Sequence, residues 1–214
     1  WTLIFRYYQG YDSAGVAFKK NGSISVIKNL GRVNQLTKKL NLKTNQSNLG
    51  IAHTRWATHG IPSEKNAHPH HSKNIFVVHN GIIENHDDLR AYLKAEGIRF
   101  STQTDTEVIG HLIRTFTEKG QSFEKAVFNT IKKLKGAYAL GIIDKNNPEQ
   151  IIGVRNQSPL VLGKGFEENF IASDVMALAP VTNKFTYLDD GQVALLSSHK
   201  TVVKNISSKI VRTK

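Results

Sequence analysis

The chain has 214 residues, of which 39% are hydrophobic and 21% are charged, as expected for a soluble globular protein with one large domain or two small ones. It contains no cysteine, which excludes disulfides, thiolate metal sites and cysteine nucleophiles within these 214 residues. The formal net charge is +12, but the basic residues are spread along the chain, so we expect a lysine-rich solvated surface and no nucleic-acid partner.

The N-terminus has no cleavage-site pattern, and Arg6 interrupts its apolar stretch. No apolar run approaches the length of a membrane span. We therefore expect no signal peptide and no membrane segment, and the absence of cysteine fits a cytoplasmic protein.

Turn residues and apolar periodicity divide the chain into short elements. The first half is predicted to contain a glycine-bounded turn at 10–15, hairpin strands at 16–18 and 24–27 around Asn21-Gly22, a helix at 33–42, a buried strand end at 49–52, a loop at 60–74, and a strand at 75–78.

The second half begins with helices and ends with strands. Thr104 and Glu107 have the spacing of a capping box. The predicted elements are helices at 87–95, 104–118 and 122–134, strands at 137–143, 151–154, 160–162 and 170–172, a helical turn at 175–178, a hairpin of 185–188 with 193–196, and closing strands at 202–203 and 210–211. Strands on both sides of a helical block, without a repeat or linker, predict α+β layers in a single domain.

Three polar clusters follow predicted strands or precede a helix: Arg55 to His59, His79-Asn80-Gly81 and Thr104-Asp105. An arginine can bind an α-carboxylate through two parallel hydrogen bonds, and a carboxylate can hold an α-ammonium group. An asparagine amide beside a glycine N–H can form an oxyanion hole. The ordinary alternatives are a surface arginine, an Asn-Gly turn and an aspartate at a helix start.

Motifs across nearly the whole chain carry a family resemblance. They are Gly10-Tyr11-Asp12-Ser13-Ala14-Gly15, the stretch from Gly50 to Gly60, Asn66-Ala67-His68-Pro69-His70, Val78 to Asn85, Thr104 to Ile109, Gly136-Ala137-Tyr138, Ser158 to Val161 and Glu168 to Asp174. Together they resemble the class II (type-2, Ntn-hydrolase) glutamine amidotransferase domain of glutamine–fructose-6-phosphate aminotransferases. The resemblance implies a four-layer αββα sandwich. Residues 1–214 would form one such domain, lacking the first strand and much of the first helix, and without the sugar-isomerase domains.

The resemblance also implies roles for individual residues. Arg55 would bind the α-carboxylate of L-glutamine, and Asp105 would receive its α-ammonium group. Asn80 and Gly81 would form the oxyanion hole. The remaining implied site residues belong to the loop that closes over glutamine, or lie near the site: Trp56, Thr58, His59 and His68. No cofactor is implied.

The family nucleophile is an N-terminal cysteine whose own amine acts as the general base. Residue 1 of this chain is tryptophan, and Gln9 stands where the family has an arginine. We therefore expect no glutamine hydrolysis at a family-like rate by the chain as given. An alternative is a catalytically dead glutamine-binding or interaction module, or a gene remnant. Fructose 6-phosphate and a homodimer would involve only the full-length parent.

Histidine density suggests a metal site as a rival interpretation, because seven of the nine histidines fall between His53 and His86. Their spacing matches no metal motif, and no cysteine is available as a ligand. We therefore expect no metal.

Overall fold

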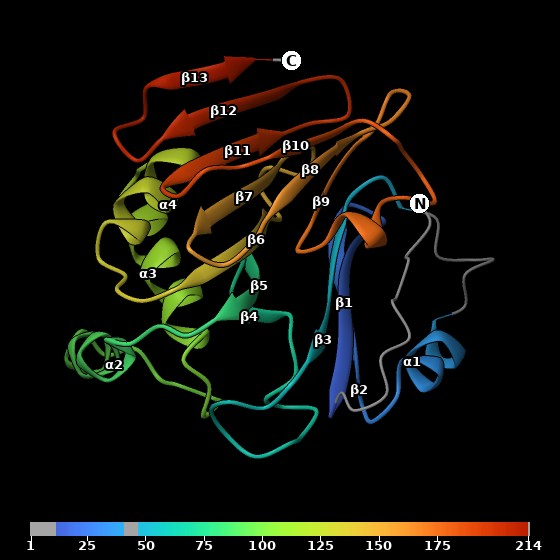
Figure 1. Cartoon of the computed structure of the whole chain (residues 1–214). Helices are drawn as coiled ribbons and strands as arrows, with labels where there is room; N and C mark the ends of the chain where they lie inside the picture. The colour runs from blue at the N-terminus through green and yellow to red at the C-terminus, as the bar shows by residue number, and fades with distance from the viewer. Residues whose placement is uncertain (1–11, 41–46, 214) are drawn as a thin grey trace.

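The computed structural model describes residues 12–40 and 47–213. Its strands form three antiparallel sheets (Figure 1), with the orders β2-β1-β3, β10-β8-β9 and β13-β12-β11-β7-β6-β5-β4. The strands are β1 Ser13–Lys20, β2 Ser23–Leu30, β3 Gly50–Arg55, β4 His70–Ser72, β5 Ile75–Gly81, β6 Tyr138–Asp144, β7 Ile151–Asn156, β8 Val161–Lys164, β9 Asn169–Ala172, β10 Phe185–Tyr187, β11 Gln192–Leu196, β12 Thr201–Asn205 and β13 Ile210–Thr213.

Helices cover the outer faces of the stacked sheets. Helix α1 (Val33–Lys39) lies on the outside of the β1–β3 sheet. Helices α2 (His86–Ala95), α3 (Glu107–Glu118) and α4 (Phe123–Ile131) lie on the opposite side of the molecule, where α3 and α4 cover the seven-stranded sheet and α2 packs against α3. A short 3-10 helix, η1, covers Val175–Ala177. The described chain is therefore an α+β sandwich with the layer order αββα, as the resemblance implies.

Period-two alternation explains the layers, because successive strand residues face opposite sides of a sheet. In β6, Leu140 and Ile142 pack with the helices, whereas Ala139 and Ile143 pack toward the smaller sheets. A third apolar cluster joins β1 to α1 through Ala14, Val16, Phe18, Leu36 and Leu40. Three apolar layers between four structural layers follow from this pattern.

The predicted hairpin of 185–188 with 193–196 is wrong. Strand β10 pairs with β8, with Phe185 opposite Gly163, whereas β11 pairs with β7 and β12 in the seven-stranded sheet. The turn at Asp189-Asp190-Gly191 therefore carries the chain from one sheet to another. Local turn residues predict a reversal, but they do not say which sheet each strand joins.

The capping box is also wrong. Helix α3 begins at Glu107, and its N-cap, Thr106, makes no side-chain capping bond. The Glu107 carboxylate instead accepts hydrogen bonds from the backbone and hydroxyl groups of Ser101 and Thr102. The helix starts three residues later than predicted.

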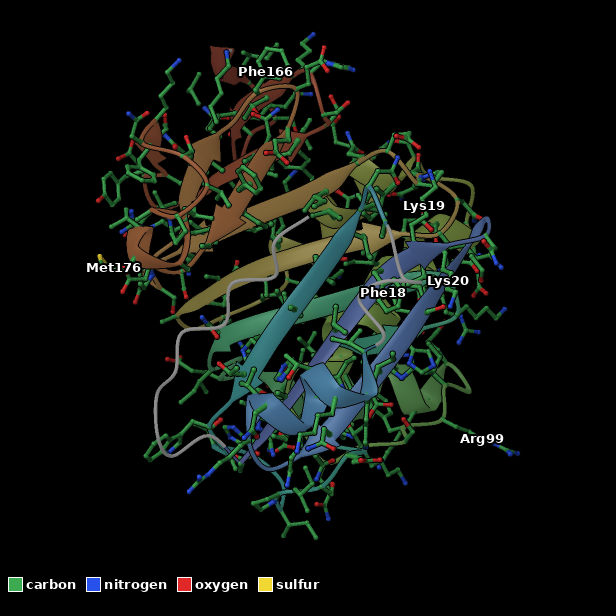
Figure 2. All side chains as sticks on the ribbon, turned by 90° about the vertical axis from the view of Figure 1, so that its right-hand side faces the viewer. Phe18, Lys19, Lys20, Arg99, Phe166 and Met176 are labelled. Carbon is green, nitrogen blue, oxygen red and sulfur yellow. The ribbon has the colours of Figure 1, made fainter. Side chains whose placement is uncertain are left out.

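Smaller differences concern strand limits. Ser13 to Gly15, predicted as part of a turn, belong to β1, where Ser13 pairs with both Leu30 and Arg55. The loop predicted at 60–74 contains β4. Lys19 and Lys20 lie by the β1–β2 turn, and Arg99 lies apart from them (Figure 2).

Several features discussed from the sequence lie outside the described residues: Trp1, Gln9, the start of the 10–15 turn and the end of the 33–42 helix. Within the described ranges, no helix is both long and apolar enough to cross a membrane.

Candidate functional site

A cavity of about 800 Å3 lies where β3 faces the ends of β5 and β6 and the strand β9. Concave sites of this size with a few convergent polar groups are typical ligand sites. All eight residues that the sequence singles out line it: Arg55, Trp56, Thr58, His59, His68, Asn80, Gly81 and Asp105. Residues from four separate stretches of the sequence therefore meet in one place.

Arg55 is the last residue of β3, which runs three residues beyond the predicted strand end at 52. Its guanidinium group is buried, and Nη1 lies 3.4 Å from Oδ1 of Asp12. Nη2 donates hydrogen bonds to the backbone carbonyl groups of His59 and Gly60, at 2.6 and 3.0 Å. Arg55 thus holds the loop that follows β3, and its charge lies at the cavity wall.

The loop after β3 is fixed at both ends. Oδ2 of Asp12 accepts a 2.5 Å hydrogen bond from the backbone N–H of Ala57, and Arg55 binds the carbonyl groups at the far end. The Trp56 side chain between these anchors is 69% exposed. Because Trp56, Thr58 and His59 also line the cavity, this loop forms part of its mouth.

Asn80 and Gly81 end β5. Oδ1 of Asn80 lies 2.7 Å from Nε2 of His53, which comes from the facing sheet. Gly81 has φ of +123°, and a Cβ atom there would lie 2.0 Å from the carbonyl oxygen of Ala137. Only glycine fits this backbone. Because Gly81 is next to Asn80, its backbone N–H and the Asn80 side-chain amide could both donate to one ligand oxygen.

Asp105 lies in the turn before α3. Its buried carboxylate accepts a 2.9 Å hydrogen bond from the backbone N–H of Ile83, two residues after Gly81. This bond ties the segment after β5 to the start of α3. The two stretches are far apart in the sequence, yet the bond brings a negative charge to the cavity that also contains the Arg55 guanidinium group.

Four histidines from three strands and a loop form a cluster beside these groups: His53, His68, His70 and His79. The ring centroids of His53 and His68 are 4.2 Å apart, and those of His68 and His70 are 4.7 Å apart. The Thr106 hydroxyl lies 2.9 Å from Nε2 of His68 and 3.0 Å from Nδ1 of His79, and so joins two of the rings.

Burial keeps these rings neutral. It lowers the pKa of His53 to about 4 and that of His70 to about 3, since an imidazolium ion loses hydration inside the fold. Burial likewise lowers the pKa of His79 to about 4, although Asp105 acts in the opposite direction. The pKa of His68 also lies well below its ordinary value because of burial and the neighbouring rings. At neutral pH the cluster therefore contributes uncharged hydrogen-bonding groups.

No group of histidine, aspartate and glutamate side chains suited to a metal ion occurs in the ranges 12–40 and 47–213. Three of the clustered rings instead contact threonine hydroxyls, as in the 3.1 Å contact between Thr104 and Nε2 of His70. The cluster therefore has the contacts of a packed polar network.

Asp12, His53 and Thr106 were not predicted as site residues from the sequence. In the fold, each of the three contacts a predicted site residue. Only Thr106 is also next to a predicted site residue, Asp105, in the sequence. The signal available for Thr106 was the run Thr104-Asp105-Thr106. Asp12 and His53 act across strands, through pairings that no local pattern specifies.

The sequence of the chain matches one protein-family model. The model described as "Glutamine amidotransferase domain" matches residues 53–180, which include the ends of β3 and β5 and the start of α3. The chain is 49% identical over 207 residues to the glutamine–fructose-6-phosphate aminotransferase [isomerizing] of Buchnera aphidicola, covering 96% of this chain and 34% of the relative. It is 50% identical over 188 residues to the enzyme of that name from Escherichia coli K12, covering 87% and 31%.

Solved structures share the architecture. A glutamine phosphoribosylpyrophosphate amidotransferase from B. subtilis superposes with a TM-score of 0.79 at 24% identity, covering 94% of this chain and 44% of that one. A glutamine aminotransferase class-II domain protein from Silicibacter pomeroyi has a TM-score of 0.63 at 15% identity, and 91% of each chain is covered. At these identities the structures support the fold alone. The chain spans about a third of the length of the curated relatives it matches.

Proposed function

Because the chain belongs to the glutamine amidotransferase domain family, we propose that its cavity binds L-glutamine. The observation that carries the proposal is the meeting of Arg55, Asp105 and the Asn80–Gly81 pair in one cavity. L-Glutamine carries a carboxylate, an ammonium group and a carboxamide. The cavity offers a cation, an anion and amide N–H donors, one for each.

The roles follow from these charges. Arg55 binds the α-carboxylate with the donors that Asp12 and the loop carbonyl groups leave free, since a guanidinium group has five N–H donors. Asp105 accepts from the α-ammonium group. Asn80 and Gly81 donate to the carboxamide oxygen. Trp56, Thr58 and His59 close the mouth, and His68 supports the wall through its contact with Thr106.

Titration calorimetry of the 214-residue chain tests the proposal. We expect L-glutamine to bind, and glutaramate, which lacks the α-ammonium group, to bind more weakly. Asp105→Asn should weaken L-glutamine binding about 10- to 100-fold, the size expected for loss of a charge-assisted hydrogen bond, and should leave glutaramate binding nearly unchanged.

Asp144→Asn is the matched control. Asp144 is also buried, but its carboxylate accepts from Asn146 and Asn147 in a turn at the end of β6, outside the cavity lining. It should leave the affinity for L-glutamine unchanged. No detectable L-glutamine binding by the unsubstituted chain would overturn the proposal, and so would equal weakening by the two substitutions.

We further propose that a polypeptide of these 214 residues binds L-glutamine without hydrolysing it. The family nucleophile is a cysteine, and the sequence has none. The observation favours a glutamine-binding module for this polypeptide, as distinct from a working glutaminase. An ammonia-release assay alongside calorimetry tests this, because binding with turnover would contradict it.

The proposal extends to a longer protein of the relatives' kind. There, residues 1–214 act as one glutaminase domain that releases ammonia for glucosamine 6-phosphate synthesis in the cytoplasm. Fructose 6-phosphate binding and the homodimer belong to sugar-isomerase domains outside these residues. Calorimetry with fructose 6-phosphate and sedimentation of the 214-residue chain should therefore give no binding and a monomer. Either binding or a stable dimer would contradict this division of roles.

A further inference from the structure

His53 and Asn80 form a side-chain contact that joins the two facing sheets at the cavity wall. His53 belongs to β3, and Asn80 belongs to β5 of the seven-stranded sheet. Nε2 of His53 lies 2.7 Å from Oδ1 of Asn80, which is the length of a short, well-formed hydrogen bond. Both residues line the cavity. The contact therefore lies at the amide that we propose binds the ligand.

With Oδ1 of Asn80 facing the ring, the donor in this contact is His53. An amide oxygen can only accept hydrogen bonds, so the proton of the imidazole lies on Nε2. Burial lowers the pKa of His53 to about 4, and at neutral pH the ring therefore carries a single N–H. The tautomer with that proton on Nδ1 would instead accept from the amide nitrogen of Asn80, and would require the opposite orientation of the amide.

The histidine cluster holds the His53 ring in place. The ring packs against His68, whose Nε2 contacts the Thr106 hydroxyl, and Thr106 in turn contacts Nδ1 of His79. His79 directly precedes Asn80 in β5. The ring that orients the Asn80 side chain is thus anchored through residues that also fix the strand carrying Asn80.

We propose that His53 is a positioning residue: by donating to Oδ1 of Asn80, it fixes the amide so that Nδ2 remains the donor end available to a ligand oxygen. This inference rests on the proposed function, since the oriented Asn80 amide would bind the carboxamide of L-glutamine. A flipped Asn80 amide would place an acceptor against the carboxamide oxygen and would repel it. His53 therefore determines which end of the Asn80 amide faces the carboxamide.

Two variants test the role. His53→Phe keeps a flat ring against His68 but removes the donor, and His53→Gln restores an N–H that can reach Asn80. The ligands are L-glutamine and L-norvaline, which has the same α-groups and chain but no carboxamide. We expect His53→Phe to weaken L-glutamine binding about 3- to 10-fold, the size of one net hydrogen bond, and to change L-norvaline binding less than about twofold. His53→Gln should recover most of the loss.

His71→Phe is the control, because His71 lies outside the cavity lining, where its ring stacks on Phe76. It should leave both affinities unchanged. Equal weakening of both ligands by His53→Phe would show a merely structural role and would overturn the proposal.

A second readout needs no ligand. Long-range 1H–15N correlation spectra of the free chain should show His53 protonated on Nε2, and the side-chain NH2 signals of Asn80 should move in His53→Phe. An Nδ1-protonated His53 would overturn the proposal. If the unsubstituted chain binds no L-glutamine, the proposed function fails, while the tautomer still decides whether His53 orients Asn80.

Discussion

Arg55 and Asp12 are paired at the point where β3 gives way to the loop over the cavity. Nη1 of Arg55 lies 3.4 Å from Oδ1 of Asp12, and the backbone N–H of Asp12 donates to the carbonyl group of Arg55 at 3.0 Å. The second carboxylate oxygen of Asp12 accepts from Ala57. One aspartate thus neutralises the buried guanidinium group and fixes the start of the loop, so the cavity mouth and its proposed carboxylate-binding residue depend on the same ion pair.

Asp12→Asn should lower the free energy of unfolding by about 2–4 kcal/mol, because the substitution leaves the buried guanidinium group without its counter-charge. Urea denaturation measures the loss. The control is Glu149→Gln, which breaks the exposed pair between Lys19 and Glu149. Exposed pairs contribute about 0–1 kcal/mol, so the control should change stability little. Equal effects from the two variants would contradict a structural role for the Arg55–Asp12 pair.

Gly81→Ala should lower the free energy of unfolding by about 2–5 kcal/mol. The alanine would have to adopt a backbone conformation that suits glycine, and its Cβ atom would overlap the carbonyl group of Ala137. Gly97→Ala separates the two causes, because Gly97 also has a positive φ, of +79°, but a Cβ there meets nothing within 4 Å. It should cost only about 1–2 kcal/mol in thermal or urea denaturation. A Gly81 variant no less stable than the Gly97 variant would show that the close approach to Ala137 relaxes freely.

Strongly periodic segments were predictable from the sequence. Ser122 was expected to open a helix, and its hydroxyl does cap α4 by accepting from the backbone N–H of Lys125. The Asn21-Gly22 hairpin is confirmed as well, since β1 and β2 pair antiparallel on either side of it. In these cases the information lies within a few residues of the element, where turn chemistry and periodicity act.

Partners distant in the sequence were not predictable by the same means. The sequence pattern gave Glu107 a local capping partner, Thr104, but the fold supplies four upstream donors to its carboxylate. The pattern also predicted that β10 and β11 pair with each other, but β10 pairs with β8 and β11 pairs with β7. The chemistry of the polar clusters singled out Arg55, Asn80, Gly81 and Asp105, and the family resemblance added the other candidate site residues, which line the same cavity. The hydrogen bond between His53 and Asn80 depends on how two sheets stack, and local sequence patterns do not predict that stacking.

Thr106→Val should lower the free energy of unfolding by about 2–4 kcal/mol, because it removes a hydroxyl that two buried imidazole rings share and leaves them without that partner. Thr130→Val is a matched control: Thr130 is also fully buried, but its hydroxyl has no hydrogen-bond partner among the described residues. The control should be neutral or stabilising in denaturation experiments. If both variants lose stability equally, the shared hydroxyl contributes no more than an isolated one.

The histidine cluster should make the fold sensitive to acid. Each of the four rings has a lowered pKa in the folded chain, to about 4 for His53 and His79, to about 3 for His70, and well below the ordinary value for His68. In the unfolded chain each titrates near its ordinary value of 6.5. Between these values the unfolded state binds protons that the folded state does not, so stability falls as the pH falls from about 6.5 toward 4.

Each histidine should contribute a slope of about 1 kcal/mol per pH unit near pH 6, so His70→Gln should reduce the slope of unfolding free energy against pH by about that amount. Urea denaturation between pH 7.5 and 5.5 measures it. Thr104→Val is the control, because it removes the hydroxyl bonded to His70 but keeps the titrating ring. It should lower stability at every pH without changing the slope. An unchanged slope in His70→Gln would mean that His70 binds protons equally in both states, and that burial does not keep this ring neutral.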